Sequence, residues 1–271
     1  MENLKFKNPV FVTRPLLPSI DEYGKRIKEI WENKWLTNHG PLEQELQLKL
    51  KKFLGVKNIE LFANGHISLE LAIKTLNLTG EIITTPFTFA STTQSIINNG
   101  LTPVYADIDE EYYNLNPDNI EELITDKTTA IMPVHVFGNP CEVEKIDKIA
   151  KKYDLNVIYD AAHAFNVSIN EIPIGNYGDL SMFSFHATKV FNTVEGGALV
   201  FENDDFNYRL KSIKNFGITP DTEEVQFLGQ NGKMNEFEAA MGIVNLENVE
   251  NAISKRKQLY EKYLESLSYK F

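Results

Sequence analysis

A lysine between two apolar runs is the residue of this sequence with the clearest chemical potential. Lys189 lies in the segment 184–197, between the runs 180–183 and 198–201, which predict buried strands. An ammonium removed from water is costly unless it is paired or its pKa falls. A lysine with a lowered pKa has a free amine that can form a Schiff base with a carbonyl. Taken alone, Lys189 is more simply a solvated loop lysine, and its chemical role needs support from other residues.

An aspartate upstream gives Lys189 a possible partner. Asp160 directly follows the apolar strand at 157–158, and open α/β sheets place ligand contacts at the carboxyl ends of such strands. Pyridoxal phosphate enzymes need a Schiff-base lysine and an acid beside the pyridine nitrogen, which keeps the ring protonated. The alternative for Asp160 is a carboxylate that caps the following helix.

A glycine turn between a strand and a helix suggests an anion site. The predicted strand 59–63 ends in Asn64, Gly65 and His66, which lead into a helix that reaches Leu76. Free backbone N–H groups and the helix dipole both favour an anion at such a turn. The same arrangement occurs throughout α/β proteins, so the turn needs support from other motifs.

Strands and helices alternate along most of the chain. Further strands are predicted at 82–85, 102–106 and 130–135, and helices at 20–31, 42–54, 87–97, 117–124, 142–153 and 207–215. A long loop is predicted at 216–233, and Asn235 is a predicted N-cap, with Glu236 and Glu238 in the first turn of the last helix. This alternation predicts an α/β fold with a mostly parallel sheet covered by helices on both faces.

Composition excludes several classes of protein. No run among the 271 residues approaches the roughly 18 apolar residues of a membrane span, and the N-terminus lacks a signal-peptide apolar region, so we expect a cytoplasmic protein. The net charge of −11 argues against nucleic acid, and the single Cys141 excludes an intrachain disulfide or a cysteine-cluster metal site. We expect Cys141 to have a packing role. The candidate cations for an anionic ligand are Arg14, Arg209, Lys211 and Lys214.

Six segments together resemble one known family. They are 35–41, 85–92, 133–138, 160–164, 184–197 and 231–236, and they occur in the order and spacing of the DegT/DnrJ/EryC1/StrS sugar aminotransferases, which use pyridoxal phosphate. The resemblance implies an aspartate aminotransferase-like fold (fold type I of pyridoxal phosphate enzymes). It also implies a large cofactor-binding domain at 1–234, which includes the N-terminal helical segment. Residues 235–271 would be a helix leading to a small domain that is largely missing.

The resemblance assigns roles to eight residues, of which Lys189 and Asp160 would be catalytic. The implied cofactor-binding residues are Gly65, His66, Phe89, Asp160, His163, Ser184, Lys189 and Asn231.

Phosphate contacts are implied for Gly65, Ser184 and Asn231, with Asn231 reaching the site of the neighbouring subunit in a homodimer. His66 replaces the hydroxyl residue usual in the family, which leaves only the backbone contact of this turn intact. Without the resemblance, Asn231 is more simply a loop residue in a turn with Gly232.

Ring contacts are implied for two further residues. Phe89 matches an aromatic that stacks on the pyridine ring, and His163 stands where most relatives have a glutamine and would hydrogen-bond the phenolic oxygen. Without the resemblance, Phe89 could be a phenylalanine of the hydrophobic core, and His163 could be a hydrogen-bonded histidine of the core.

The implied reaction is transamination of a nucleotide-linked keto-deoxysugar, with glutamate as the amino donor. A few family members are dehydratases with histidine in place of the lysine, but here Lys189 is present. The segments look most similar to enzymes that aminate dTDP-4-keto-6-deoxyglucose at C4, the viosamine-forming type in deoxysugar, O-antigen and lipopolysaccharide biosynthesis. Two alternatives stay open: a 3-keto sugar aminotransferase, and a non-catalytic pyridoxal phosphate-binding regulatory protein, which the short C-terminal part suggests.

Overall fold

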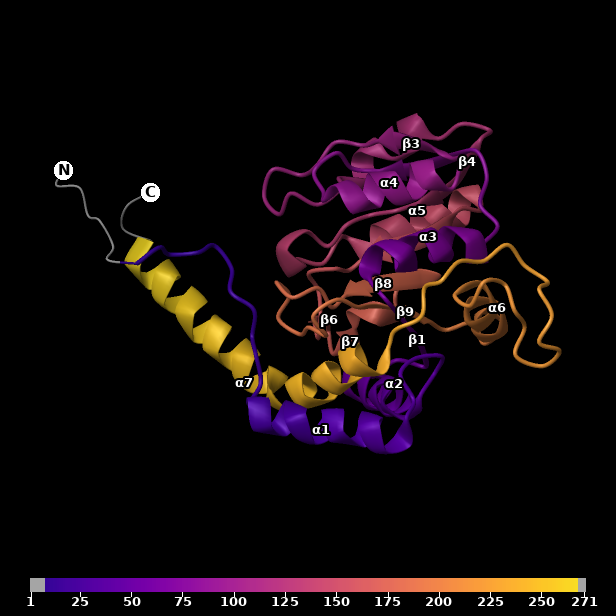
Figure 1. The fold of residues 1–271 in the computed structure, drawn as a ribbon. Helices are drawn as coiled ribbons and strands as arrows, with labels where there is room; N and C mark the ends of the chain where they lie inside the picture. The colour runs from indigo at the N-terminus through magenta and orange to yellow at the C-terminus, as the bar shows by residue number, and fades with distance from the viewer. Residues whose placement is uncertain (1–7, 268–271) are drawn as a thin grey trace.

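A seven-stranded sheet forms the centre of the molecule, as the computed structural model of residues 8–267 shows (Figure 1). The strand order is β1-β9-β8-β5-β4-β2-β3. The strands are β1 (Asn58–Phe62), β2 (Glu81–Thr84), β3 (Thr102–Tyr105), β4 (Thr128–Ile131), β5 (Asn156–Asp160), β8 (Leu180–Ser184) and β9 (Gly197–Phe201). Only β9 runs antiparallel to its neighbours β1 and β8, and all other pairs are parallel. The carboxyl ends of six strands therefore share one edge of the sheet.

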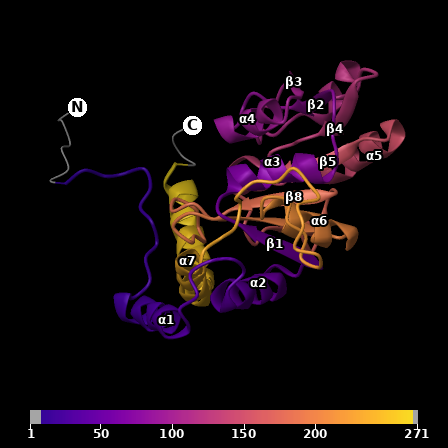
Figure 2. The same ribbon diagram turned by 45° about the vertical axis from the view of Figure 1, so that its right-hand side comes forward.

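Both faces of the sheet are covered by helices, as the strand-helix alternation predicts. On β5, Ile158 packs into one hydrophobic core, whereas Val157 and Tyr159 pack into the other. The first core contains α3 (Gly65–Thr75), α4 (Ala90–Asn98) and α6 (Asp205–Ile213), and the second contains α1 (Ile20–Asn33), α2 (Pro41–Leu54), α5 (Val143–Tyr153) and α7 (Glu236–Leu267). Figures 1 and 2 show α1, α2 and the first turns of α7 side by side.

The last helix begins where the sequence predicts it. The Asn235 side chain accepts hydrogen bonds from the amides of Phe237 and Glu238, both at 3.0 Å, and the Glu238 carboxylate accepts one from the Asn235 amide at 3.2 Å. This reciprocal arrangement is a capping box. α7 continues as a single helix whose second half extends away from the sheet (Figure 1). The division into two domains stays a prediction, and residues 268–271 lie outside the described part of the chain.

Three predicted elements differ in the structure. The predicted helix 117–124 is wrong: the chain forms two 3₁₀ turns, Pro117–Asn119 and Glu121–Leu123, because its backbone bonds run from residue i+3 to i before the chain turns into β4. The strand predicted at 130–135 is β4, which ends at Ile131, two residues before Pro133, which has no N–H to donate to the ladder. The helix predicted from residue 87 begins at Ala90, because the Phe87 amide donates to the Thr85 hydroxyl in a turn.

A short hairpin completes the fold, formed by β6 (Ser168–Ile169) and β7 (Ile172–Pro173). Cys141 is buried, and its thiol donates a hydrogen bond to the Val134 carbonyl at 3.1 Å, as a packing role predicts. None of the helices within residues 8–267 has the length and apolar character needed to cross a membrane. Across the same residues, no group of three or more metal-ligating side chains comes together.

Candidate active site

The ends of three parallel strands bring predicted site residues to one edge of the sheet. Asp160 is the last residue of β5, Ser184 is the last residue of β8, and the turn that contains Gly65 follows β1. Gly65 lies so close to β8 that a Cβ atom on it would be 3.0 Å from Met182 Sδ and 3.2 Å from Ser184 Cβ. The sheet therefore positions this turn directly beside Ser184.

Lys189 is half-buried in the loop that joins β8 to β9. Its amide donates to the His186 carbonyl at 2.9 Å, and the loop is closed by a hydrogen bond from the Thr193 amide to the Phe185 carbonyl, also at 2.9 Å. Burial lowers the pKa of the Lys189 amine, and the negative charge of Asp160 offsets part of that lowering. The pKa of Lys189 thus moves in the direction that favours a free, nucleophilic amine.

Asp160 is buried, with only 4% of the residue exposed. Its oxygens accept hydrogen bonds from the Thr92 hydroxyl at 2.7 Å and the Ala162 amide at 3.1 Å. Within residues 8–267, no cationic side chain lies within ion-pair distance of it. Burial raises the pKa of Asp160, and the hydrogen bonds and the charges at His163 and Lys189 oppose this rise. A positively charged ring N–H placed against this carboxylate would complete the pairing, which is the chemistry expected for a pyridine ring.

The His163 ring lies close enough to these two residues to interact with both. Its side chain keeps contact with solvent, yet the surrounding protein lowers the pKa of His163 by desolvation, and the positive charge of Lys189 lowers it further. The ring stacks parallel to Phe137, with a centroid distance of 6.4 Å and an angle of 4°. His163 is therefore held beside the Lys189–Asp160 pair, and not within a hydrophobic core.

The turn at Gly65 has the features of an anion site. The Asn64 side chain caps α3 by accepting a hydrogen bond from the Ile67 amide at 2.9 Å. In the described part of the chain, the amides of Gly65 and His66 donate no hydrogen bond, and the first turn of α3 has no acidic residue. Gly197 of β9 packs against the turn so closely that a Cβ atom on it would be 2.6 Å from the Gly65 nitrogen. The unpaired donors fit a phosphate.

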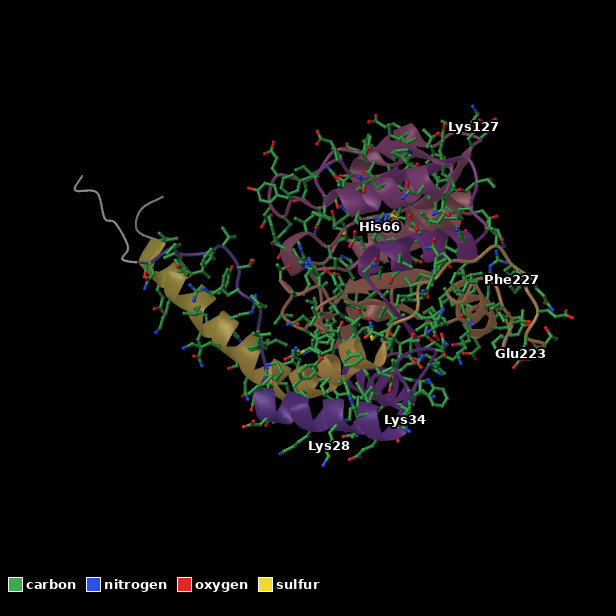
Figure 3. All side chains as sticks on the ribbon, in the orientation of Figure 1. Lys28, Lys34, His66, Lys127, Glu223 and Phe227 are labelled. Carbon is green, nitrogen blue, oxygen red and sulfur yellow. The ribbon has the colours of Figure 1, made fainter. Side chains whose placement is uncertain are left out.

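The His66 side chain is engaged away from this turn. Its ring forms a hydrogen bond with the Ser91 hydroxyl at 2.8 Å and lies 3.3 Å from the Glu70 carboxylate. Figure 3 shows His66 between α3 and α4. Its contribution to the anion site is therefore its backbone amide, as the sequence suggests.

Two predicted residues lie at the margin of this assembly. Phe89 is 80% exposed at the N-cap of α4, three residues before Thr92, so its ring is not part of a core. The Asn231 side chain is exposed and accepts a hydrogen bond from Lys233 at 2.8 Å. Thus the structure gathers Asp160, His163 and Lys189, and places Gly65 against Ser184. It leaves the side chains of Phe89 and Asn231 on the surface.

Two residues that contact the site were not predicted to do so. Thr92 lies in the motif 85–92 without an assigned role, and its hydroxyl binds Asp160 from α4, far away in the sequence. Asn64 precedes a glycine at a helix start, a known N-cap signal that could have identified it. The prediction that Lys214 is a candidate cation for an anionic ligand is wrong, because Lys214 is only 5% exposed and pairs with two buried glutamates.

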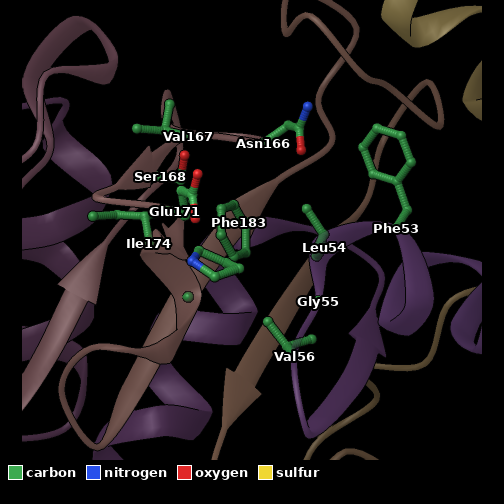
Figure 4. A pocket seen from close by; sticks show the side chains of 12 residues that line it. Phe53, Leu54, Gly55, Val56, Asn166, Val167, Ser168, Glu171, Ile174 and Phe183 are labelled. Atoms are coloured by element: carbon green, nitrogen blue, oxygen red, sulfur yellow. The ribbon is translucent and has the colours of Figure 1, made fainter.

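A separate pocket lies beside the small β6–β7 hairpin (Figure 4). It is formed by the end of α2, the hairpin and the side chain of Phe183. None of the eight predicted site residues lines it. This pocket therefore takes no part in the arrangement around Lys189.

Comparison with known proteins identifies the family. The model of the DegT/DnrJ/EryC1/StrS aminotransferase family matches residues 19–269. The chain belongs to this family. It is 47% identical over 250 residues to dTDP-4-amino-4,6-dideoxy-D-glucose transaminase of Shigella dysenteriae, covering 92% of this chain and 68% of that protein. The enzyme of the same name from Escherichia coli is also 47% identical, over 249 residues, covering 91% of this chain and 66% of that protein.

Solved structures of sugar aminotransferases share the fold. The structure of DesI with its TDP-sugar product superimposes with a TM-score of 0.92 at 35% identity, covering 97% of this chain and 67% of DesI. The predicted α/β fold of this DegT/DnrJ/EryC1/StrS family member is therefore confirmed. The chain spans about two thirds of the length of these relatives.

Proposed function

We propose that this aminotransferase-family chain uses pyridoxal phosphate to transfer the amino group of glutamate to a nucleotide-linked 4-keto-6-deoxysugar. The observation that carries the proposal is that a half-buried lysine of lowered pKa, Lys189, lies near the buried carboxylate of Asp160, which has no ion-pair partner among residues 8–267. The free amides of the Gly65 turn support it, because they could hold the phosphate end of the same cofactor.

Each residue would have a defined task. When bound, the cofactor supplies an aldehyde that captures amines and a ring that withdraws electrons from the adjacent carbon. Lys189 Nζ would hold the aldehyde and, once displaced by glutamate, carry the proton to and from the reacting carbon. Asp160 would keep a proton on the ring nitrogen, and His163 would donate to or accept from the phenolic oxygen. Ser184 and the amides of Gly65 and His66 would bind the phosphate, and Phe89 would cover the ring.

The sugar is proposed from the names of the relatives. Proteins that are 47% identical over more than nine tenths of this chain are named dTDP-4-amino-4,6-dideoxy-D-glucose transaminases. Amination at C4 of a dTDP-linked sugar is therefore the first candidate, and amination at C3 is the competing outcome. The cytoplasmic location expected from the sequence stays a prediction.

A spectroscopic and product experiment tests the proposal. We expect the protein to gain the absorbance band of lysine-bound pyridoxal phosphate, to lose it with glutamate, and to convert the 4-keto sugar nucleotide to the 4-amino sugar. The position of the new amine is read by NMR. Lys189→Ala should abolish the band and lower turnover by about 10³-fold or more, because it removes both the covalent anchor and the proton carrier.

His186→Ala is a matched control, because it changes the same loop and leaves Lys189 in place. His186 is exposed and has no assigned chemical role. It should keep the absorbance band. A wild-type protein that lacks the absorbance band and does not react with glutamate would instead indicate a non-catalytic protein. A product with its amine at C3 would show that the enzyme acts on a 3-keto sugar.

A homodimer with shared sites is part of the proposal. Asn231 is exposed and lies next to Gly232, whose carbonyl accepts a hydrogen bond from the Ala63 amide at 2.8 Å. The segment that carries Asn231 therefore passes beside the anion-binding turn at the molecular surface. From there its side chain would reach the phosphate in the partner subunit.

A further inference from the structure

A buried lysine lies between two buried glutamates next to β1. Lys214, the C-cap of α6, is 5% exposed, and Glu43 and Glu60 are 1% and 0% exposed. Lys214 Nζ lies 3.4 Å from a Glu43 oxygen and forms an ion pair with Glu60. Burial alone lowers the pKa of Lys214, but the two carboxylates raise it above the ordinary value, so the amine is held charged. Such a group seldom adds stability compared with apolar packing, which suggests another role.

Lys214 ties α6 to the strand that leads into the anion-binding turn. Its Nζ donates a hydrogen bond to the Leu61 carbonyl of β1 at 3.1 Å. At the other end of β1, Lys57 forms an exposed ion pair of 2.9 Å with Asp204, just before α6 begins. The strand and the helix are therefore joined at both ends, and the buried connection is the one close to Gly65.

The backbone of Lys214 reaches the same turn by a second route. Its carbonyl accepts a hydrogen bond from the Gly232 amide at 2.9 Å, and the Gly232 carbonyl accepts one from the Ala63 amide at 2.8 Å. Ala63 directly precedes Asn64, whose side chain caps α3. The side chain and the main chain of Lys214 thus both fix the residues immediately before Gly65.

We propose that Lys214 is a positioning residue that holds the Asn64–Gly65 turn in the geometry that binds a phosphate. The inference rests on the proposed function, because the phosphate is that of the cofactor. Lys214 is too deeply buried to touch the phosphate itself. Its effect arises because two backbone amides must converge on one anion, and a binding group that is displaced slightly loses much of its value.

Comparing pyridoxal phosphate with pyridoxal isolates this effect. Pyridoxal keeps the aldehyde that reacts with Lys189 and lacks the phosphate. Both dissociation constants are read from the absorbance of the lysine-bound form. The dissociation constant of pyridoxal divided by that of pyridoxal phosphate measures the preference for the phosphate. We expect Lys214→Met to lower this ratio about tenfold, with pyridoxal binding little changed. Lys57→Met, at the other end of β1, is the matched control and should keep the wild-type ratio.

A second variant covers the risk that Lys214→Met does not fold, since it leaves two carboxylates buried without a cation. The triple change Lys214→Met, Glu43→Gln and Glu60→Gln removes the charges together, and its melting temperature is measured alongside. It should retain the low phosphate preference. A wild-type preference in either variant would overturn the inference. Absence of lysine-bound cofactor in the wild-type protein would instead overturn the proposed function, because both aldehydes would then fail to bind.

Discussion

At the scale of single residues, the environment of Asp160 decides whether its carboxylate can serve a ring nitrogen. Burial raises its pKa, and the hydroxyl of Thr92 and the amide of Ala162 oppose that rise. The candidacy of Asp160 follows from its type and its place at the end of β5, and that of Lys189 from its place between two buried strands. The contribution of Thr92 could not be predicted from the sequence, because it depends on how α4 packs over β5.

Thr92→Val should therefore raise the pKa of Asp160 further. In the proposed function Asp160 must be ionised to keep the ring protonated, so the acidic limb of the pH–rate profile should move to higher pH. Loss of a hydrogen bond to a charged group should also lower turnover about tenfold. The adjacent Thr93→Val is the control, since the Thr93 hydroxyl contacts Tyr105 and not Asp160. An unchanged acidic limb in Thr92→Val would contradict the role given to this hydrogen bond.

At the scale of elements, helix and strand positions follow the sequence wherever a strong local pattern exists. The capping box at Asn235 and the alternation of core residues along β5 are both readable in the chain. The segment 117–124 was mispredicted because its apolar residues suit a helix, whereas the chain must turn into β4 immediately afterwards. Lys214 was mispredicted for a related reason, since its burial comes from α2 and β1, which are distant in sequence.

The first turn of α7 carries a carboxyl whose pKa is raised to about 7, mainly by burial, with a contribution from Glu195. This is Glu238. Between its ordinary value of 4.5 and about 7, the folded state binds the proton more tightly than the unfolded state, so the free energy of unfolding falls as the pH rises. Glu238→Gln keeps an oxygen that can accept the hydrogen bond from the Asn235 amide. It removes the decrease in the free energy of unfolding with rising pH.

We expect Glu238→Gln to be more stable than the wild type by about 1–2 kcal/mol at alkaline pH, after allowance for solvent screening, and to be nearly equal to it under acidic conditions. Denaturant unfolding at several pH values checks this. Glu247→Gln, at an exposed position of the same helix, should follow the wild-type curve. Parallel curves for Glu238→Gln and the wild type would show that Glu238 does not titrate in this range.

At the scale of the whole molecule, the sheet places the loop of Lys189 and the turn of Gly65 at one edge, and the fold and family predicted from the sequence are confirmed. The sequence could not show how subunits meet, because Asn231 lies on the surface and its partner would belong to another chain. The homodimer with shared sites is therefore the prediction that belongs to this scale.

Mixing two variants that the proposal expects to be inactive tests the shared site. In a dimer of Lys189→Ala with Asn231→Ala, one site combines the intact lysine of one subunit with the intact asparagine of the other. After subunit exchange at equal amounts, we expect recovery of about a quarter of wild-type turnover, because half of the dimers are mixed and each has one intact site. Mixing Lys189→Ala with Asp160→Asn should recover nothing, since both residues belong to the same subunit's site. No recovery in the first mixture would place Asn231 in its own subunit's site.

The pairing of β1 with β9 also has a consequence for how the chain folds. Phe62 pairs with Gly197, so the Gly65 turn and the loop of Lys189 are brought together by contacts between segments far apart in the sequence. Contacts of this kind form slowly, because the entropy cost of closing a large loop comes before the stabilisation by the contacts themselves. We therefore expect a refolding chain to regain its helices early and the proposed capacity of Lys189 to capture an aldehyde late.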